Sequence, residues 1–562
     1  MMKKKTVLSC VVLLLLTTNT DRIKAQNTDK QNFEISKNLE IFNALFKELN
    51  SLYVDSIKVE SIIQTGIDAM LASLDPYTEY YPENKVSDLN FIATGEYAGI
   101  GAIITQREGK IYIAEPYEGM PAAKHGLEAG DELLEIDGLT LKGMNTTEVS
   151  NKLKGQANTI LKIKYLRQGV KKPTSINVKR AIVHINPVTY YGVIEGSKVG
   201  YIYLSMFTNE AAAQVKSAFE EMKKEQHIES LIIDLRNNGG GVMEDAVQLV
   251  NIFVPKGELI VSTKGRIKQR DRMYRTSQKS IDENVPLVVI TNRGSASSSE
   301  IVAGALQDLD RAVIIGQRTF GKGLVQSASE LPYNGSLKVT TNKYYIPSGR
   351  CIQAIDYKNR NSDGSVGIIP DSLTNVFYTS KGRPVKDGGG IKPDINIDEG
   401  KMSNIVYYLL TEYTISDFAT QWKQKNKEIA PIQKFALSEQ DYQDFKDFVK
   451  SKEFTYDRQS EKGLKNLKEM MEFEDYLSTS TEEIAALEEK LKPNLDRDLD
   501  KYKEEIIKQI SLEIAKRYYF QKGEIIQSLK NDKVLDKAIQ ILDDKEQYKS
   551  ILSKQEEIKT EE

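Results

Sequence analysis

The spacing of apolar residues divides the chain into regions of different character. Between Phe33 and Leu74 the apolar residues lie three or four positions apart, at Leu39, Phe42, Leu45, Phe46 and Leu49 and again at Ile62, Ile63, Ile67, Met70 and Leu71. This spacing predicts two helices joined around residues 53–55. Pro76 follows, and proline ends a helical pattern because it lacks a backbone N–H and clashes with the preceding turn.

Between about Phe91 and Gln168 short apolar runs alternate with glycine-containing turns, which predicts a compact, mostly-β module. The run resembles a PDZ domain over its whole length. In that family a glycine-rich loop, here Gly99-Ile100-Gly101, offers backbone N–H groups to the terminal carboxylate of a peptide that adds to the sheet edge. The alternative is a tight turn without a ligand. A dinucleotide-binding loop is excluded, because the third glycine is missing and a strand follows.

Strands and helices are expected to alternate from Lys198 onward. The apolar runs predict strands at residues 199–207, 231–235, 287–291 and 312–316 and helices at 211–222, 242–253 and 301–309. Such alternation favours a layered α/β core, closed by strands through residues 337–345 and the segment 388–394. Beyond about Gly400, Lys, Glu and Leu or Ile recur at helical spacing and predict a helical extension, a candidate surface for an adaptor or for homo-oligomerisation.

Composition and charge narrow the classes of function. A formal net charge of −3 over 562 residues gives no support for nucleic-acid binding. The three histidines, His125, His184 and His227, lie far apart without ligand spacing, which disfavours a histidine-based metal site or a Ser-His-Asp triad. We therefore expect neither metal nor cofactor. Cys351, the one cysteine outside the N-terminal segment, is expected to be a small buried apolar residue.

The first residues resemble an export signal. Lys3 to Lys5 form a basic segment, and Val7 to Leu16 form an apolar core too short to span a bilayer as a stable helix. Cleavage after Ala25 would remove this signal, and an uncleaved anchor is the alternative. Cys10 lies inside the apolar core, whereas a lipidated cysteine should follow it. These features predict an exported protein of the periplasm or cell envelope.

A cluster of small hydroxyl residues, Gly294 to Glu300, precedes the apolar helical run that starts at Ile301. The serines and Glu300 form a capping box, and serines in this position commonly do nothing more than start a helix. A helix N-terminus also suits a nucleophile, because its free N–H groups and its dipole favour developing negative charge. Ser297 is therefore a candidate for either role.

A single lysine, Lys322, lies in a glycine-rich turn about 25 residues further on. Residues 316–322 match the first seven positions of the phosphate-binding GxxxxGK[ST] loop, but the eighth is Gly323 and a strand is expected to follow. Nucleotide binding is the weaker interpretation. A lysine that burial keeps neutral can take the proton of a serine, which requires its pKa to fall from about 10.4 toward 7.

A third polar segment follows a buried strand, Asp234-Leu235-Arg236-Asn237-Asn238-Gly239-Gly240-Gly241. Glycines at such a place commonly form a strand-to-helix turn. They also let backbone N–H groups approach a substrate carbonyl closely, as an oxyanion hole requires.

Together, these segments resemble the signature of the C-terminal processing peptidases, the tail-specific serine proteases of peptidase family S41. That family shows DLRxNxGG, then G-[ST]-A-S-x-S-E, then TFGKGxxQ, with a PDZ domain and an LDPY segment upstream; all occur here in that order, and the resemblance covers about Phe33 to Ile397. It implies Ser297 as nucleophile, Lys322 as general base, Gln326 as the residue that orients the lysine, and Gly240 with the N–H of Ser298 as the oxyanion hole. Two departures from the pattern are Gly239, where many relatives have Pro or Ser, and Ser298, where Ala is common.

The resemblance implies a multidomain chain with a ClpP/crotonase-like layered α/β protease core and a mostly-β PDZ domain between helical regions. The predicted boundaries are 1–25 for the signal, 26–90 for the N-terminal helices, 91–175 for the PDZ domain, 176–400 for the core and 401–562 for the helical extension. The expected function is cleavage of proteins with flexible C-terminal tails. The rival is a catalytically inert PDZ scaffold whose helical tail binds partners.

Overall fold

The computed structural model describes residues 29–361, 364–398, 400–456, 458–491 and 494–553. The chain separates into two compact units, residues 1–80 and 81–562. The described part of the first unit contains a helix through residues 29–52 and helix α2, Val59–Ala72. These are the two helices that the apolar spacing predicts. The predicted signal segment lies outside the described residues. No helix in the described ranges is both long and apolar enough to cross a membrane.

The second unit begins with a β domain. Its elements are α3 (Val86–Thr94), β2 (Glu96–Gly99), β3 (Ala102–Arg107), β4 (Lys110–Pro116), α4 (Pro121–Lys124), β5 (Glu132–Ile136), β6 (Leu139–Thr140), α5 (Thr146–Leu153), β7 (Ile160–Leu166), β8 (Thr174–Lys179) and β9 (Ala181–His184). The main sheet has the order β3-β4-β5-β7-β8, so β3 is an edge strand. A separate apolar cluster fills this domain.

The layered core follows the β domain. Its main elements are β10 (Val188–Val193), β11 (Val199–Leu204), α6 (Ala211–Glu225), β12 (Ser230–Asp234), α7 (Met243–Asn251), β15 (Leu287–Thr291), α8 (Ser298–Asp308), β16 (Val313–Gly316) and β23 (Ile395–Asn396). They form a six-stranded sheet of order β10-β11-β12-β15-β16-β23 that is parallel except for β10. Parallel strands that are buried on both faces have nearly continuous apolar sequences, and the strands of this sheet do as well.

A second sheet is antiparallel, and its strands alternate along the chain with those of the first sheet. It contains β13 (Leu259–Gly265), β14 (Arg272–Arg275), β17 (Leu324–Glu330) and β18 (Ser336–Tyr345). The short hairpins β19 (Ile355–Arg360) with β20 (Val366–Ile368) and β21 (Val376–Tyr378) with β22 (Pro384–Lys386) follow. Because Lys322 is followed by strand β17, the loop lacks the helix that a phosphate-binding loop would need.

The rest of the chain is helical. The helices are α9 (Asn404–Thr411), α10 (Thr414–Lys425), α11 (Glu439–Ser451), α12 (Gln459–Phe473), α13 (Thr481–Leu491), α14 (Leu495–Lys501), α15 (Lys503–Ser528), α16 (Lys533–Asp543) and α17 (Lys545–Ile551). Helices α9, α10, α11, α14 and α15 share one apolar cluster. The predicted helical extension is therefore a folded domain with its own core.

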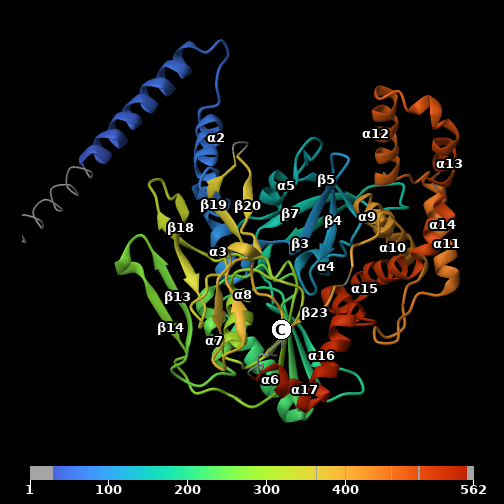
Figure 1. The fold of residues 1–562 in the computed structure, drawn as a ribbon. Helices are drawn as coiled ribbons and strands as arrows, with labels where there is room; N and C mark the ends of the chain where they lie inside the picture. The colour runs from blue at the N-terminus through green and yellow to red at the C-terminus, as the bar shows by residue number, and fades with distance from the viewer. Residues whose placement is uncertain (1–28, 362–363, 399, 457, 492–493, 554–562) are drawn as a thin grey trace, which may run out of the picture. The chain divides into compact units, whose positions relative to one another are not determined.

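The last helices pack against the layered core. Alternate residues of the central strands face opposite sides of the sheet, and on one side they pack against α6, α7 and α8. On the other side Val199, Tyr201, Ile232, Val288, Ile290, Val313 and Ile315 pack against Val534, Leu535, Ala538, Ile541 and Leu542 of α16. Figure 1 shows α16 and α17, in red, beside this sheet. The sheet is thus buried on both faces only when α16 is in place.

Candidate active site

Ser297 lies in a strained turn immediately before α8. Its φ of +56° is a conformation that residues other than glycine seldom adopt, and such strain concentrates at functional sites. The side chain is half-buried. This turn places the Ser297 hydroxyl at the positive end of the helix dipole. The N–H groups of Ser299 and Glu300 donate to the carbonyls of Ala296 and Ser297, and the N–H of Ser298 is the one predicted to face the oxyanion.

The neighbouring serines differ from Ser297 in how their hydroxyl groups are used. All three are fully buried, and each donates to a backbone carbonyl of the glycine-rich segment: Ser295 to Leu235 at 2.7 Å, Ser298 to Gly241 at 2.9 Å and Ser299 to Asn238 at 2.9 Å. Within the part of the chain that the structure describes, the Ser297 hydroxyl donates to no such acceptor. Of the four serines, Ser297 alone keeps its proton available for a base.

The glycine-rich turn reaches the serine through Gly240. Its φ is +100°, and a Cβ atom placed on it would lie 2.6 Å from Ser297 Cβ and 2.9 Å from Ser298 N. Only glycine allows such an approach. The structure therefore brings together Gly240, Ser297 and Ser298, as predicted for an oxyanion hole. The Gly240 N–H itself donates to Asn238 Oδ1 at 2.9 Å. A substrate oxygen would therefore have to replace Asn238 Oδ1 as the acceptor of this hydrogen bond.

One carboxylate joins the segments that carry Ser297 and Lys322. Glu300, in the first turn of α8, is fully buried. Its Oε2 accepts from the backbone N–H groups of Ser297 and Lys322, both at 2.9 Å. Its Oε1 accepts from Thr319 Oγ1 at 2.5 Å and from Gly321 N at 2.7 Å. Two loops that are far apart in sequence are thus fixed to each other by one side chain.

From its place in the sequence, Glu300 is predicted only to cap the helix. Its N–H partner Ser297 is the expected capping contact, but the bonds to residues 319–322 are not local and no sequence spacing indicates them. Burial raises the pKa of the Glu300 carboxyl to about 7, although the hydrogen bonds from its four donors lower the pKa. A usable signal in the sequence was the presence of an acidic residue in the first turn of an otherwise apolar helix.

Lys322 and Gln326 both lie on the loop and strand that follow β16. Lys322 is half-buried, between the buried glycines Gly321 and Gly323. Gln326, on β17, donates from Nε2 to Thr340 Oγ1 on the paired strand β18 at 3.1 Å. Its amide is thus oriented by the antiparallel sheet. Cys351, predicted to be a buried apolar residue, is half-buried, and burial raises the pKa of its thiol.

The predicted peptide-binding loop, Gly99-Ile100-Gly101, leads into the edge strand β3. Gly101 has a φ of +71°, and a Cβ atom there would lie 2.4 Å from Met120 Cβ. An edge strand presents unpaired N–H and C=O groups to which another strand can add. Helix α5 packs against β3 and contributes the fully buried Val149 to the apolar cluster of this domain. The geometry needed for strand addition is therefore present.

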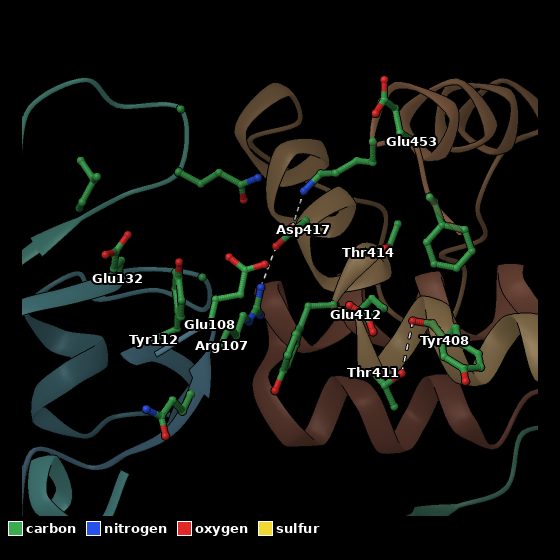
Figure 2. Close-up of a pocket in the computed structure, with 18 of the residues that line it drawn as sticks. Arg107, Glu108, Tyr112, Glu132, Tyr408, Thr411, Glu412, Thr414, Asp417 and Glu453 are labelled. Carbon is green, nitrogen blue, oxygen red and sulfur yellow. Dashed lines mark hydrogen bonds and ion pairs between the residues drawn. The ribbon is translucent and has the colours of Figure 1, made fainter. Parts of the chain in front are cut away.

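The other end of β3 contacts the C-terminal helices, beside a cleft of about 1200 Å³. Figure 2 shows Arg107 at this contact, with its guanidinium 2.8 Å from Asp417 on α10. The same guanidinium lies 3.8 Å from the ring centroid of Tyr413, and Lys452 reaches Asp417 at 2.8 Å. The β domain is thus attached to the helical domain by a largely buried ion pair and a cation–π contact.

A strained serine at a helix N-terminus, next to a glycine turn and tied to a lysine loop, is typical of a serine hydrolase. The sequence also matches three family profiles. Residues 198–372 match "Peptidase family S41", residues 112–167 match "PDZ domain", and residues 405–542 match "Probable PDZ-protease, C-terminal helical domain". Among the described residues no group of His, Cys, Asp and Glu side chains is arranged to hold a metal ion.

The chain is also similar in sequence to named proteases. The chain is 37% identical over 360 residues to the carboxy-terminal-processing protease of Bartonella bacilliformis, an alignment that covers 63% of this chain and 77% of that protein. It is 30% identical over 372 residues to a probable CtpA-like serine protease of Staphylococcus aureus, covering 66% of each. The photosystem II D1 C-terminal processing protease is 28% identical over 64% of this chain and 92% of its own, with a TM-score of 0.35.

The chain belongs to the carboxy-terminal-processing protease family and is a serine peptidase of family S41. The predicted fold class is confirmed: a PDZ domain, a mixed α/β peptidase core and a C-terminal helical domain follow one another. The roles given to individual site residues and the exact domain boundaries stay predictions.

Proposed function

We propose that the protein is an exported endopeptidase that cuts other proteins near their C-termini, with Ser297 as nucleophile and Lys322 as general base. The observation that carries this proposal is the Glu300 carboxylate, whose Oε2 accepts from the backbone N–H of both residues. The proposal of export is supported by the N-terminal sequence alone, in which the basic residues Lys3 to Lys5 precede an apolar core.

The geometry supports the following course of reaction. The Ser297 hydroxyl attacks the scissile carbonyl, and the Lys322 amine takes its proton and returns it to the leaving amine. The negative charge that forms on the carbonyl oxygen is stabilised by the N–H of Ser298, at the start of α8, and by that of Gly240. Asn238 Oδ1 holds the Gly240 N–H before substrate arrives and releases it when the oxyanion forms.

A lysine base predicts a distinctive pH dependence. We expect cleavage of an unstructured test protein with an apolar C-terminus to rise with pH as Lys322 loses its proton, and to continue in EDTA. Lys322→Ala should lower kcat by at least about 1000-fold. The measurement is mass spectrometry of the fragments over time. Full activity in Lys322→Ala, or loss of activity in EDTA, would refute a lysine base without a metal.

The PDZ domain takes the substrate tail in this proposal. A tail would add as a strand along the open edge of β3, with its terminal carboxylate at the N–H groups of the loop Gly99-Ile100-Gly101. The adjoining apolar cluster, which includes Ile100 and Val149, favours an apolar final residue.

The terminal carboxylate can be tested separately from catalysis. The full chain carrying Ser297→Ala should bind a fluorescent peptide with an apolar, free C-terminus at least about tenfold more tightly than the same peptide amidated, because the amide has no charge to offer the loop N–H groups. Fluorescence anisotropy measures both affinities. Equal affinities would assign the loop to a simple turn.

A further inference from the structure

Asp532 lies where the C-terminal helices meet the catalytic sheet, and its carboxylate makes two separate contacts. Oδ1 accepts from the backbone N–H groups of Val534 at 2.9 Å and Leu535 at 3.1 Å, and so caps α16. Oδ2 lies 2.7 Å from Arg236 Nη2. The side chain is only 4% exposed. A helix cap needs just one of these oxygens, so the second is available for the ion pair with Arg236.

Arg236 follows the end of strand β12 and is held between two carboxylates. Its Nη2 lies 2.6 Å from Asp234 Oδ2, and its Nε lies 3.1 Å from Asp234 Oδ1. Tyr201 from β11 donates to Asp234 Oδ2 at 2.8 Å. One anchor of the guanidinium therefore belongs to the core sheet, while the other, Asp532, comes from a helix about 300 residues later. Because the Arg236 and Asp532 side chains are only 14% and 4% exposed, such charged hydrogen bonds fix their geometry strongly.

Arg236 is the first residue of the segment that reaches the nucleophile. Asn237, which follows it, has a φ of +60°. The Asn238 carbonyl accepts from Ala296 N at 3.0 Å and from Ser299 Oγ at 2.9 Å. Gly240 then lies against Ser297. A displacement of Arg236 would therefore move the N–H of Gly240 relative to the Ser297 hydroxyl, and small displacements of catalytic groups reduce rates strongly.

We propose that Asp532 is a positioning residue for the peptidase reaction: by holding Arg236, it fixes residues 237–241 against Ser297. The C-terminal helical domain thereby completes the active site, although none of its residues touches the substrate in this role. This inference rests on the proposed function, in which Ser297 is the nucleophile and the Gly240 N–H stabilises the oxyanion.

Asp532→Asn separates the two contacts of the carboxylate. Asparagine caps helices about as well as aspartate, but when its oxygen faces the helix its NH₂ group faces Arg236, so the ion pair is lost and the cap is kept. We expect kcat to fall about tenfold while KM changes by less than about twofold, because the displaced N–H acts mainly in the transition state. The melting temperature should change by no more than a few degrees.

Asp544→Asn is the matched control. Asp544 caps α17 by accepting from Gln547 N at 2.9 Å, is exposed, and forms no ion pair among the residues that the structure describes. Its kcat should equal that of wild type. Unchanged kcat in Asp532→Asn would overturn the inference. An equal fall in both variants would also overturn it, since it would trace the effect to helix capping.

A second readout does not depend on activity. Hydrogen exchange of residues 237–241, measured in the Ser297→Ala background, should be faster after Asp532→Asn and unchanged after Asp544→Asn. If wild type cleaves nothing, the proposed function fails, and exchange still decides whether Asp532 holds this segment. Unchanged exchange in Asp532→Asn would overturn the positioning role even in an active peptidase.

Discussion

Replacing Ser297 with alanine will abolish peptide-bond cleavage and leave the fold intact. We expect kcat to fall by at least about 10⁴-fold, because no other hydroxyl in the cluster keeps a free proton. The Ser297 hydroxyl makes no donor bond that folding requires, so the melting temperature should stay within a few degrees of wild type. Mass spectrometry of a digested test protein, together with calorimetry, measures both quantities.

Ser298→Ala is the control for this result, because it removes the neighbouring hydroxyl of the same cluster. The change removes the hydrogen bond from Ser298 Oγ to Gly241 O, which should lower the unfolding free energy by about 1 kcal/mol. It retains the backbone N–H that the oxyanion needs, so kcat should stay within about tenfold of wild type. Fragments that persist in Ser297→Ala and disappear in Ser298→Ala would exchange the roles of the two serines.

Replacing Glu300 with glutamine will impair both stability and activity. Four donors converge on the carboxylate, so in either orientation the new NH₂ group faces two of them. Leaving two buried donors unpaired costs about 1–3 kcal/mol each, so we expect the unfolding free energy to fall by about 2–6 kcal/mol. Because the loops of Ser297 and Lys322 would separate, kcat should fall at least about 100-fold.

Glu148→Gln is the matched control for Glu300→Gln. Glu148 completes an exposed capping box on α5 by accepting from Asn145 N at 2.8 Å. Since water can replace this bond, the change should cost less than about 0.5 kcal/mol. Denaturant unfolding of both variants and cleavage assays below their melting temperatures separate lost stability from lost catalysis. A kcat close to wild type in Glu300→Gln would show that the shared carboxylate does not organise the site.

Glu300 should also leave a signature in the pH dependence of stability. Its pKa of about 7 in the folded protein exceeds the value of about 4.3 in an unfolded chain, so the folded state binds the extra proton between these values. The stability that this group contributes is present below about pH 4.3 and is lost as the pH rises through about 7. The unfolding free energy of Glu300→Gln, relative to wild type, should therefore rise with pH over this range, by at most about 1.4 kcal/mol per pH unit.

The elements of the core could be predicted because each depends on local spacing. Residues 231–235 form a continuous apolar run and become the buried strand β12, while the strand after Lys322 excludes a nucleotide loop. Contacts between distant residues could not be predicted in this way. Nothing near Glu300 indicates that it meets residues 319–322, and nothing near Asp532 indicates Arg236, since tertiary packing alone decides which buried charges become partners.

The same limit applies to the oxyanion hole. The structure places Gly240 against Ser297, and the role of its N–H in an oxyanion hole stays a prediction. The Gly240 N–H donates to Asn238 Oδ1 because of the rotamer of the Asn238 side chain. The order of residues in the sequence does not indicate this rotamer. The sequence was therefore most reliable for which backbone segments meet and least reliable for how their polar groups are paired.

The placement of α16 on the catalytic sheet has a consequence for how the enzyme is made. The ribosome releases the strands of the core long before residues 533–543, which cover the second face of the sheet. A growing or prematurely terminated chain therefore carries Ser297 and Lys322 on a sheet with one bare apolar side and with Arg236 lacking one of its two anchors. The packing surface behind the strands that carry the peptidase site is therefore complete only after the last helices of the chain have been made.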